Sequence, residues 1–283
     1  MPCQAPCACL MVTEGFDDPR HSYPMGDRSS LGTLIMKSTP PYTASCLLLV
    51  AALVACTGCR GSSSPTAPEI PATPVSLSLS METAHFLLQY TAQNTDKMDA
   101  YAAALEANHP RITRDLGQPN LARITGRFYP DQASYTAATG WDATGSVDGP
   151  TMFSVVASPL QPGVPVHEFV HNVALHLNPT AHHTVWLWEA TAVYEAEGFV
   201  HPATVPCLAS GGDFPTLAQV STRTGDCHIY LVGYTIVELI VERWGFAELR
   251  ALIRSHGNTQ SVLGLSTEEF EAAWQAFVEQ RYL

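Results

Sequence analysis

The sequence contains little positive charge. Only 14 of its 283 residues are Lys or Arg, against 26 Asp or Glu, so the formal net charge at pH 7 is -12. The basic residues are spread thinly and form no basic run, which argues against nucleic acid as a partner. No internal repeat is visible either. With 46% hydrophobic and 14% charged residues, the composition predicts one ordinary globular core with a surface of unusually low charge.

Long apolar runs are also lacking. The main apolar run near the N-terminus, residues 44–55 (ASCLLLVAALVA), follows the positive start Met36-Lys37. It is too short to span a bilayer and suits the core of a signal peptide. The run ends in LVAC at Cys56, which resembles the lipobox of bacterial lipoproteins. That resemblance implies a lipoprotein signal peptide at 36–55, and a lipid on Cys56 that anchors the exported protein to the periplasmic or outer-membrane face of the cell envelope. An ordinary secretory signal cleaved nearby is the alternative.

Two segments flank this run. Residues 1–35 have no apolar run and contain acidic residues, which the start of a signal peptide avoids, so we predict that they are a mis-assigned extension and that translation begins at Met36. Residues 57–74 (TGCRGSSSPTAPEIPATP) are rich in Ser, Pro, Thr and Gly. Such a composition predicts a flexible tether at 56–75. The folded domain is then expected to span residues 76–283.

The folded part begins with a pattern of alternating strands and helices. We expect strands at 85–90, 122–129 and 151–157, a helix capped by Asp96 that runs to Leu116, a short helix opened by Pro130-Asp131, and a helix around 167–171. The rest reads as helical, with a loop at 201–213, a long apolar helix at 229–244 and a last helix at 267–282 that starts with a capping box. The fold class expected is α+β and zincin-like. A small mixed sheet is followed by a mostly helical C-terminal part, with the H-E-x-x-H helix between them.

The stretch from Val166 to Glu195 (VHEFVHNVALHLNPTAHHTVWLWEATAVYE) carries the candidate chemistry. His167, Glu168 and His171 form an H-E-x-x-H motif, and residues four apart project from the same face of a helix. Two neutral imidazoles on one face can bind one zinc ion, with the glutamate beside them as general base. The alternative is a buried pair of His and Glu side chains, hydrogen-bonded without metal.

A catalytic zinc site needs a third protein ligand and one open position. The candidates in this stretch and just beyond it are His176, His182, His183, Glu189, Glu195 and Glu197. His176 follows His167 by nine residues, one short of the metzincin pattern H-E-x-x-H-x-x-G-x-x-H, and His182 and His183 fall in an expected loop. Glu195 is turned from Glu189 by about 120° of helical rotation, and Glu197 stands about 12 Å further along the axis. Glu189 is favoured because it lies early in an apolar helix.

Two segments together resemble a known group. VHEFVH followed by WLWEATAVYE is similar to the gluzincin metallopeptidases, in which H-E-x-x-H is joined by a Glu from a W-L-x-E-x-x-A-x-Y helix, and most of all to bacterial peptidase MA-like proteins. The resemblance implies zinc bound by His167, His171 and Glu189, with Glu168 as general base. One position departs from the pattern, since Ala190 stands where the family commonly has Gly.

The resemblance also bears on the reaction. Aminopeptidases of this superfamily hold the substrate's amine with a Glu in an upstream stretch, but residues 149–157 (GPTMFSVVA) contain no acidic residue, which argues against a simple aminopeptidase. Tyr230 is the expected oxyanion donor, and Tyr234 is the alternative. We therefore expect a zinc-dependent peptidase that hydrolyses a peptide or protein substrate. The competing hypothesis is a catalytically inactive gluzincin-like lipoprotein that acts as a binding or scaffold domain in the cell envelope.

The remaining cysteines and polar neighbours have simpler predictions. Cys207 and Cys227 lie far from the N-terminal cysteines and do not form a C-x-x-C pair. In an exported protein they are expected to form a disulfide that stabilises the loop between them by about 3 kcal/mol in the chain-entropy model. His228 is expected at the surface rather than on a metal. Asn172, beside His171, has two open possibilities, a hydrogen bond to a ligand or exposure to solvent.

Overall fold

The computed structural model of the protein describes residues 75–209 and 214–283, which belong to one compact unit. The predictions for the N-terminal extension, the signal peptide, the lipid on Cys56 and nearly all of the tether fall outside the described residues. Within these described ranges, no helix combines the length and apolar character that a membrane crossing requires.

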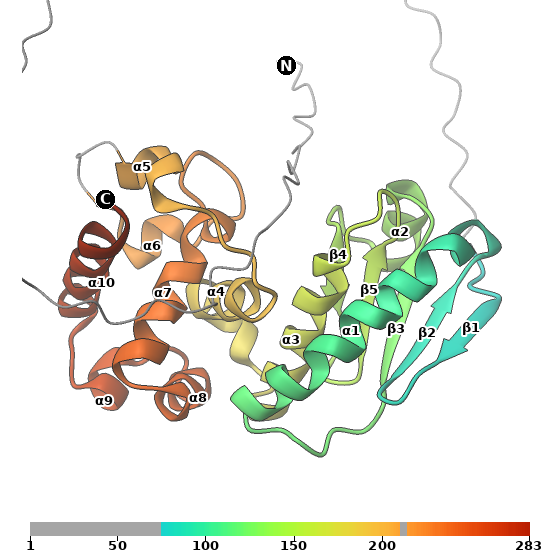
Figure 1. Ribbon diagram of the computed structural model, residues 1–283, viewed down its shortest axis with the longest axis horizontal. Coiled ribbons are helices and arrows are strands. Elements are labelled where there is room, and N and C mark those ends of the chain that lie inside the picture. The colour runs from blue at the N-terminus through green and yellow to red at the C-terminus, as the bar shows by residue number, and fades with distance from the viewer. Residues whose placement is uncertain (1–74, 210–213) are drawn as a thin grey trace, which may run out of the picture. The chain divides into compact units, whose positions relative to one another are not determined.

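The first half of the described chain forms a five-stranded mixed sheet (Figure 1). Its strands are β1 (Leu79–Glu82), β2 (Phe86–Tyr90), β3 (Ile124–Tyr129), β4 (Gly145–Val147) and β5 (Met152–Val156), in the order β1-β2-β3-β5-β4. The central pairs β2–β3 and β3–β5 are parallel, whereas the edge strands β1 and β4 are antiparallel to their neighbours. The three strands predicted from the sequence are confirmed, and both edge strands were missed because they are short.

Two helices cover one face of this sheet. They are α1 (Thr95–Asp115), which contacts β2, and α3 (Gly163–Leu177), which contacts β4 and β5, and the two helices also contact each other. Figure 1 shows α1 lying across the sheet with α3 beside it. Alternate residues of β2 are buried, as the period of a half-buried strand requires. The prediction that Asp96 caps α1 was wrong. The cap residue is Asn94, whose side chain donates to the Phe128 carbonyl oxygen instead, and Asp96 lies in the first turn.

The second half of the chain is almost entirely helical. After α3 it contains α4 (Val185–Glu195), α5 (Pro206–Ala209), α6 (Leu217–Val220), α7 (Ile229–Arg243), α8 (Phe246–Arg254), α9 (Thr259–Leu263) and α10 (Thr267–Tyr282), with 3-10 turns at η2 (Ala181–His183) and η3 (Pro202–Thr204). In the first half, the 3-10 turn η1 (Ala92–Asn94) precedes α1, and α2 (Gln132–Thr139) lies between β3 and β4. The predicted capping box is present, because Ser266 accepts from the Glu269 N–H and Glu269 accepts from the Ser266 N–H. The α+β class, with a small mixed sheet and a mostly helical remainder, is confirmed.

Helix α4 packs between α3 and α7. Its Ala190 is fully buried, and a Cβ placed on Gly233 of α7 would lie 2.9 Å from the Ala190 Cα. Glycine at position 233 therefore supplies the space that the Ala190 methyl group fills. This close approach fixes the depth at which α4 sits, and so the position of Glu189, the residue before Ala190.

Candidate metal centre

Helices α3 and α4 bring three possible metal ligands to one point. His167 and His171 lie one turn apart on α3, with their rings 4.6 Å apart and nearly perpendicular. Glu189 extends from the first half of α4 so that its Oε2 lies 3.2 Å from His167 Nε2 and 3.5 Å from His171 Nε2. All three candidate ligand atoms lie within 4.8 Å of one another, and the described residues contain no other such group.

These distances match what a metal ion needs. Ligand atoms that lie about 2.0–2.2 Å from a tetrahedral zinc are separated from one another by about 3.3–3.5 Å. The two separations from Glu189 Oε2 to the histidine Nε2 atoms, 3.2 and 3.5 Å, are close to that spacing. Two imidazole nitrogens and one carboxylate oxygen are also a donor set that zinc accepts. The three side chains therefore form a group that could hold a metal ion.

The protonation states of His171 and Glu189 suit metal binding, whereas that of His167 opposes it. Burial lowers the pKa of His171 to about 4, so its ring is neutral near pH 7. Burial also acts to lower the pKa of His167, but the hydrogen bond with Glu189 and the nearby carboxylates outweigh it and raise the pKa. For Glu189, burial acts to raise the pKa, yet the two imidazoles outweigh it and lower the pKa, so the carboxylate is charged. A metal ion competes with protons for the ligand atoms of His167, His171 and Glu189. Of these three residues, only His167 has a raised pKa and so holds its proton more tightly than a free histidine does.

Glu168 is buried beside these residues without belonging to the set of three. Burial raises the pKa of Glu168 to about 7, and the charge of Glu189 adds to the rise, whereas His167 opposes it. Its carboxyl group lies against the edge strand β4, where a Cβ on Gly145 would come within 2.8 Å of the Glu168 Cδ. Glycine at position 145 is therefore what leaves room for the carboxyl group. A glutamate with this pKa exchanges a proton readily near neutral pH.

The two candidate tyrosines have different surroundings. The Tyr230 ring lies 5.8 Å from the His167 ring, and burial together with the charge of Glu189 raises the Tyr230 pKa, so its hydroxyl keeps its proton. Tyr234 lies one turn further along α7 and packs against Tyr194 and Phe199 at 4.9 and 5.0 Å. Only Tyr230 is next to the candidate ligands.

Arg223 was missed in the sequence. It lies in the loop between α6 and α7, and its Nε and Nη2 donate to Glu189 Oε1 at 2.9 and 2.7 Å. No motif marks this position, and it stands 34 residues from Glu189. A useful signal was present all the same, because Arg223 is one of few basic residues and lies close to Cys227, whose disulfide with Cys207 fixes this loop. That predicted disulfide is confirmed.

The other ligand candidates lie elsewhere. His176 is exposed near the end of α3. His182 and His183 lie on η2, with the His182 ring 6.2 Å from Trp188 and the His183 ring 6.2 Å from His256. The structure thus does not bring these histidines into the group formed by the three ligands.

The two acidic candidates after Glu189, Glu195 and Glu197, also lie outside the group of three candidate ligands. Glu195 is fully buried at the end of α4 and its Oε2 accepts from Arg111 Nη1 at 2.5 Å. Glu197 lies beyond that end, because the helix stops at Glu195, and its Oε1 lies 3.7 Å from Arg111 Nε. Both carboxylates are therefore engaged with α1 and not with the histidines.

Asn172 and His228 lie in positions that indicate structural rather than metal-binding roles. Asn172 Nδ2 donates to the Gly149 and Met152 carbonyl oxygens at 2.8 and 2.9 Å, so this side chain joins α3 to the turn between β4 and β5. Neither possibility left open by the sequence is correct. His228 caps the start of α7, and its ring is half-buried rather than fully at the surface.

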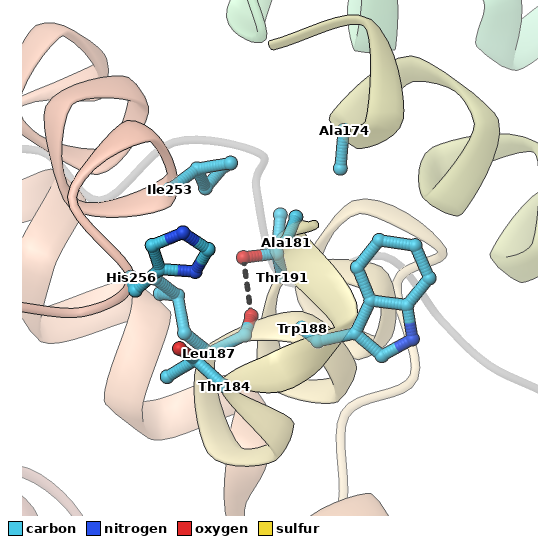
Figure 2. A pocket seen from close by; sticks show the side chains of 8 residues that line it. All are labelled: Ala174, Ala181, Thr184, Leu187, Trp188, Thr191, Ile253 and His256. Carbon is cyan, nitrogen blue, oxygen red and sulfur yellow. Dashed lines mark hydrogen bonds between the residues drawn. The ribbon is translucent and has the colours of Figure 1, made fainter. Parts of the chain in front are cut away.

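A small cavity lies beside Trp188 of α4, among residues of α3, η2, α4 and α8 and the loop after it (Figure 2). It measures about 10 Å³, room for about one water molecule. The eight residues that line it are Ala174, Ala181, Thr184, Leu187, Trp188, Thr191, Ile253 and His256. Thr191 Oγ1 bonds the Leu187 carbonyl oxygen of its own helix at 2.7 Å. Trp188 stacks on the His171 ring at 3.9 Å and so separates this cavity from the ligands. The cavity is too small for a substrate.

Comparisons of the chain with protein-family models, with curated proteins and with solved structures gave no match. The interpretation of the site therefore depends on its residues and their geometry.

Proposed function

We propose that this protein is a zinc-dependent peptidase with a zincin-like fold of the gluzincin type. One observation carries the proposal. Ligand atoms of His167, His171 and Glu189 lie within 4.8 Å of one another, while the buried carboxyl group of Glu168 lies beside them and outside the set. Three protein ligands rather than four leave one coordination position open, which distinguishes catalytic from structural zinc sites.

Each neighbouring side chain has a role in this proposal. Zinc, when bound, supplies a Lewis acid that lowers the pKa of water to about 7 and polarises a carbonyl group. Glu168, whose pKa burial raises to about 7, takes a proton from the attacking water and returns it to the leaving amine. The Tyr230 hydroxyl, which keeps its proton and lies beside His167, donates a hydrogen bond to the oxygen on which negative charge develops.

The proposed substrate class rests on the family resemblance. Residues 149–157, the stretch in which the similar aminopeptidases carry the Glu that holds a free amino terminus, contain no acidic residue. We therefore propose a peptidase that is not a simple aminopeptidase. Endopeptidase activity and cleavage from the carboxyl side both remain compatible with this sequence.

We also propose that the protein is exported and tethered to the cell envelope by a lipid on Cys56. The disulfide between Cys207 and Cys227 supports an oxidising compartment. The LVAC sequence that ends at Cys56 supports the lipid.

The decisive experiment measures zinc content and hydrolysis of a mixed peptide library for the wild-type protein and for Glu168→Gln. We expect about one zinc per chain in both proteins, and cleavage by the wild type alone. His171→Ala should lose the metal, whereas His176→Ala, an exposed histidine on the same helix, should keep both metal and activity. Zinc without cleavage that depends on Glu168 would instead favour an inactive scaffold domain, and no zinc in the wild type would reject the metal site.

A further inference from the structure

Glu189 is held from two sides that use different oxygen atoms. Its Oε2 faces the Nε2 atoms of His167 and His171, and its Oε1 accepts two hydrogen bonds from Arg223. Because each side uses a separate oxygen, Arg223 and a metal ion do not compete for the same lone pairs. The arrangement leaves Oε2 as the oxygen available to the metal.

The Arg223 contact is of a kind that fixes orientation. Both donors belong to one planar guanidinium group, and charge-assisted hydrogen bonds from such a group are short and directional. Both hydrogen bonds end on Oε1, so this oxygen is directed toward Arg223 while Oε2 faces the two imidazoles. One-oxygen coordination keeps the coordination number low and so preserves an open position for water.

The loop that carries Arg223 is itself restrained. The disulfide between Cys207 and Cys227 joins it to α5, and the Ile229 N–H donates to the Thr222 carbonyl oxygen at 3.1 Å. The Arg223 side chain is 55% exposed, whereas that of Glu189 is only 4% exposed. A half-exposed charge contributes little net stability, so the clearest consequence of this contact is the orientation of the buried carboxylate.

We propose that Arg223 is a positioning residue that holds Glu189 in one-oxygen coordination of the metal. This inference rests on the metal site in the proposed function and assigns Arg223 no contact with substrate. Residues that orient metal ligands in this way typically contribute 10–100-fold to metal affinity.

The test compares Arg223→Gln and Arg223→Lys with the wild type and with Arg123→Gln, which breaks an exposed ion pair with Glu82. Zinc affinity is measured by competition with a chromophoric chelator, and coordination by the visible spectrum of the cobalt-substituted proteins. We expect Arg223→Gln to bind zinc about 10–100-fold more weakly and to give weaker cobalt absorption, because a second carboxylate oxygen raises the coordination number. Arg223→Lys should recover part of the affinity, and Arg123→Gln should match the wild type.

Three other outcomes would overturn the inference. If Arg223→Gln binds zinc as the wild type does with an unchanged cobalt spectrum, Arg223 does not position Glu189. If only the KM for peptides changes, Arg223 contacts substrate. If Arg223→Gln binds zinc more tightly, Arg223 competes with the metal. A wild-type protein that binds zinc but cleaves no peptide would reject the peptidase and leave this inference standing, whereas a wild type that binds no zinc would reject both.

Discussion

The two ends of helix α4 each bury a glutamate that is paired with an arginine from another element. At the first end, Glu189 is 3% exposed and pairs with Arg223 of the loop before α7. At the last residue, Glu195 is fully buried and pairs with Arg111 of α1. Both residues are glutamates of the same helix, both are buried, and both pair with an arginine. These properties alone therefore do not distinguish a candidate metal ligand from a structural carboxylate.

The two glutamates differ in what surrounds the carboxylate oxygen that the arginine side chain does not contact. Glu189 Oε2 meets two imidazoles, whereas Glu195 Oε1 is buried with no hydrogen-bond partner. Arg111 also donates to the Glu195 main-chain oxygen, which lies among the terminal carbonyl groups of α4, and to Asn108 Oδ1 at 2.8 Å. Arg111 therefore closes the end of the helix onto α1, and Arg223 orients a side chain that has another task.

The largest expected difference between the two ends is in metal binding. Glu189→Gln removes one of three ligands, so we expect zinc affinity to fall by more than the roughly 10–100-fold that loss of an orienting partner costs. Glu195→Gln is the matched variant on the same helix and should bind zinc as the wild type does. Chelator competition measures both values. Equal losses in the two variants would mean that α4 as a whole, rather than Glu189, determines metal binding.

The next effect concerns the stability of the fold, and here we expect the larger loss at the Glu195 end of α4. Arg111→Ala leaves the Glu195 carboxylate buried without a cation, which typically costs about 3–5 kcal/mol. Arg223→Ala should cost less in the metal-free protein, because the two imidazoles still contact Glu189 and because Arg223 is half exposed. Urea unfolding with a chelator present measures both. A greater loss in Arg223→Ala would show that the Glu189 end stabilises the fold more.

A smaller effect is expected from the contact between α4 and α7. Gly233→Ala places a methyl group 2.9 Å from the Ala190 Cα, and overpacking of this kind costs about 1–3 kcal/mol, partly offset by about 1 kcal/mol of helix propensity. Because Ala190 follows Glu189, zinc affinity should fall as well. Gly163→Ala on α3 is the control, since nothing lies within 4 Å of the added methyl group. Unfolding and chelator titrations of both variants should separate them, and similar behaviour would show that α4 tolerates displacement.

The sequence predicted most of what depends on local pattern. The three central strands, the capping box at Ser266 and the disulfide follow from short-range signals and are present. The sequence also predicted that His167, His171 and Glu189 come together as a group that could hold a metal ion, because the two histidines share a helix face and Glu189 lies in a second helix of high apolar content. The edge strands β1 and β4 were missed because strands of three or four residues carry little periodicity.

The misses at the site have a common physical cause. Arg223, Arg111 and Gly233 act through contacts between elements that are distant in the sequence, and nothing near each residue indicates its partner. The Asp96 cap failed for a related reason, since the competing contact of Asn94 reaches across to β3. Local pattern identified the candidate ligands, whereas the residues that hold them in place become visible only from the packing of α4 against its neighbours.

A further difference between the two glutamates is a pH dependence of stability that arises at Glu195. Burial raises the pKa of Glu195 to about 7, and Asp115 adds to the rise, whereas Arg111 and Arg114 oppose it. A pKa that is higher in the folded state stabilises the fold fully below the ordinary value for Glu, 4.5, and this contribution is lost as pH rises through about 7. The free energy of unfolding of the wild type relative to Glu195→Gln should therefore decrease between about pH 5 and pH 8. Urea unfolding of both metal-free proteins across that range measures the difference, and a constant difference would mean that Arg111 keeps Glu195 ionised throughout.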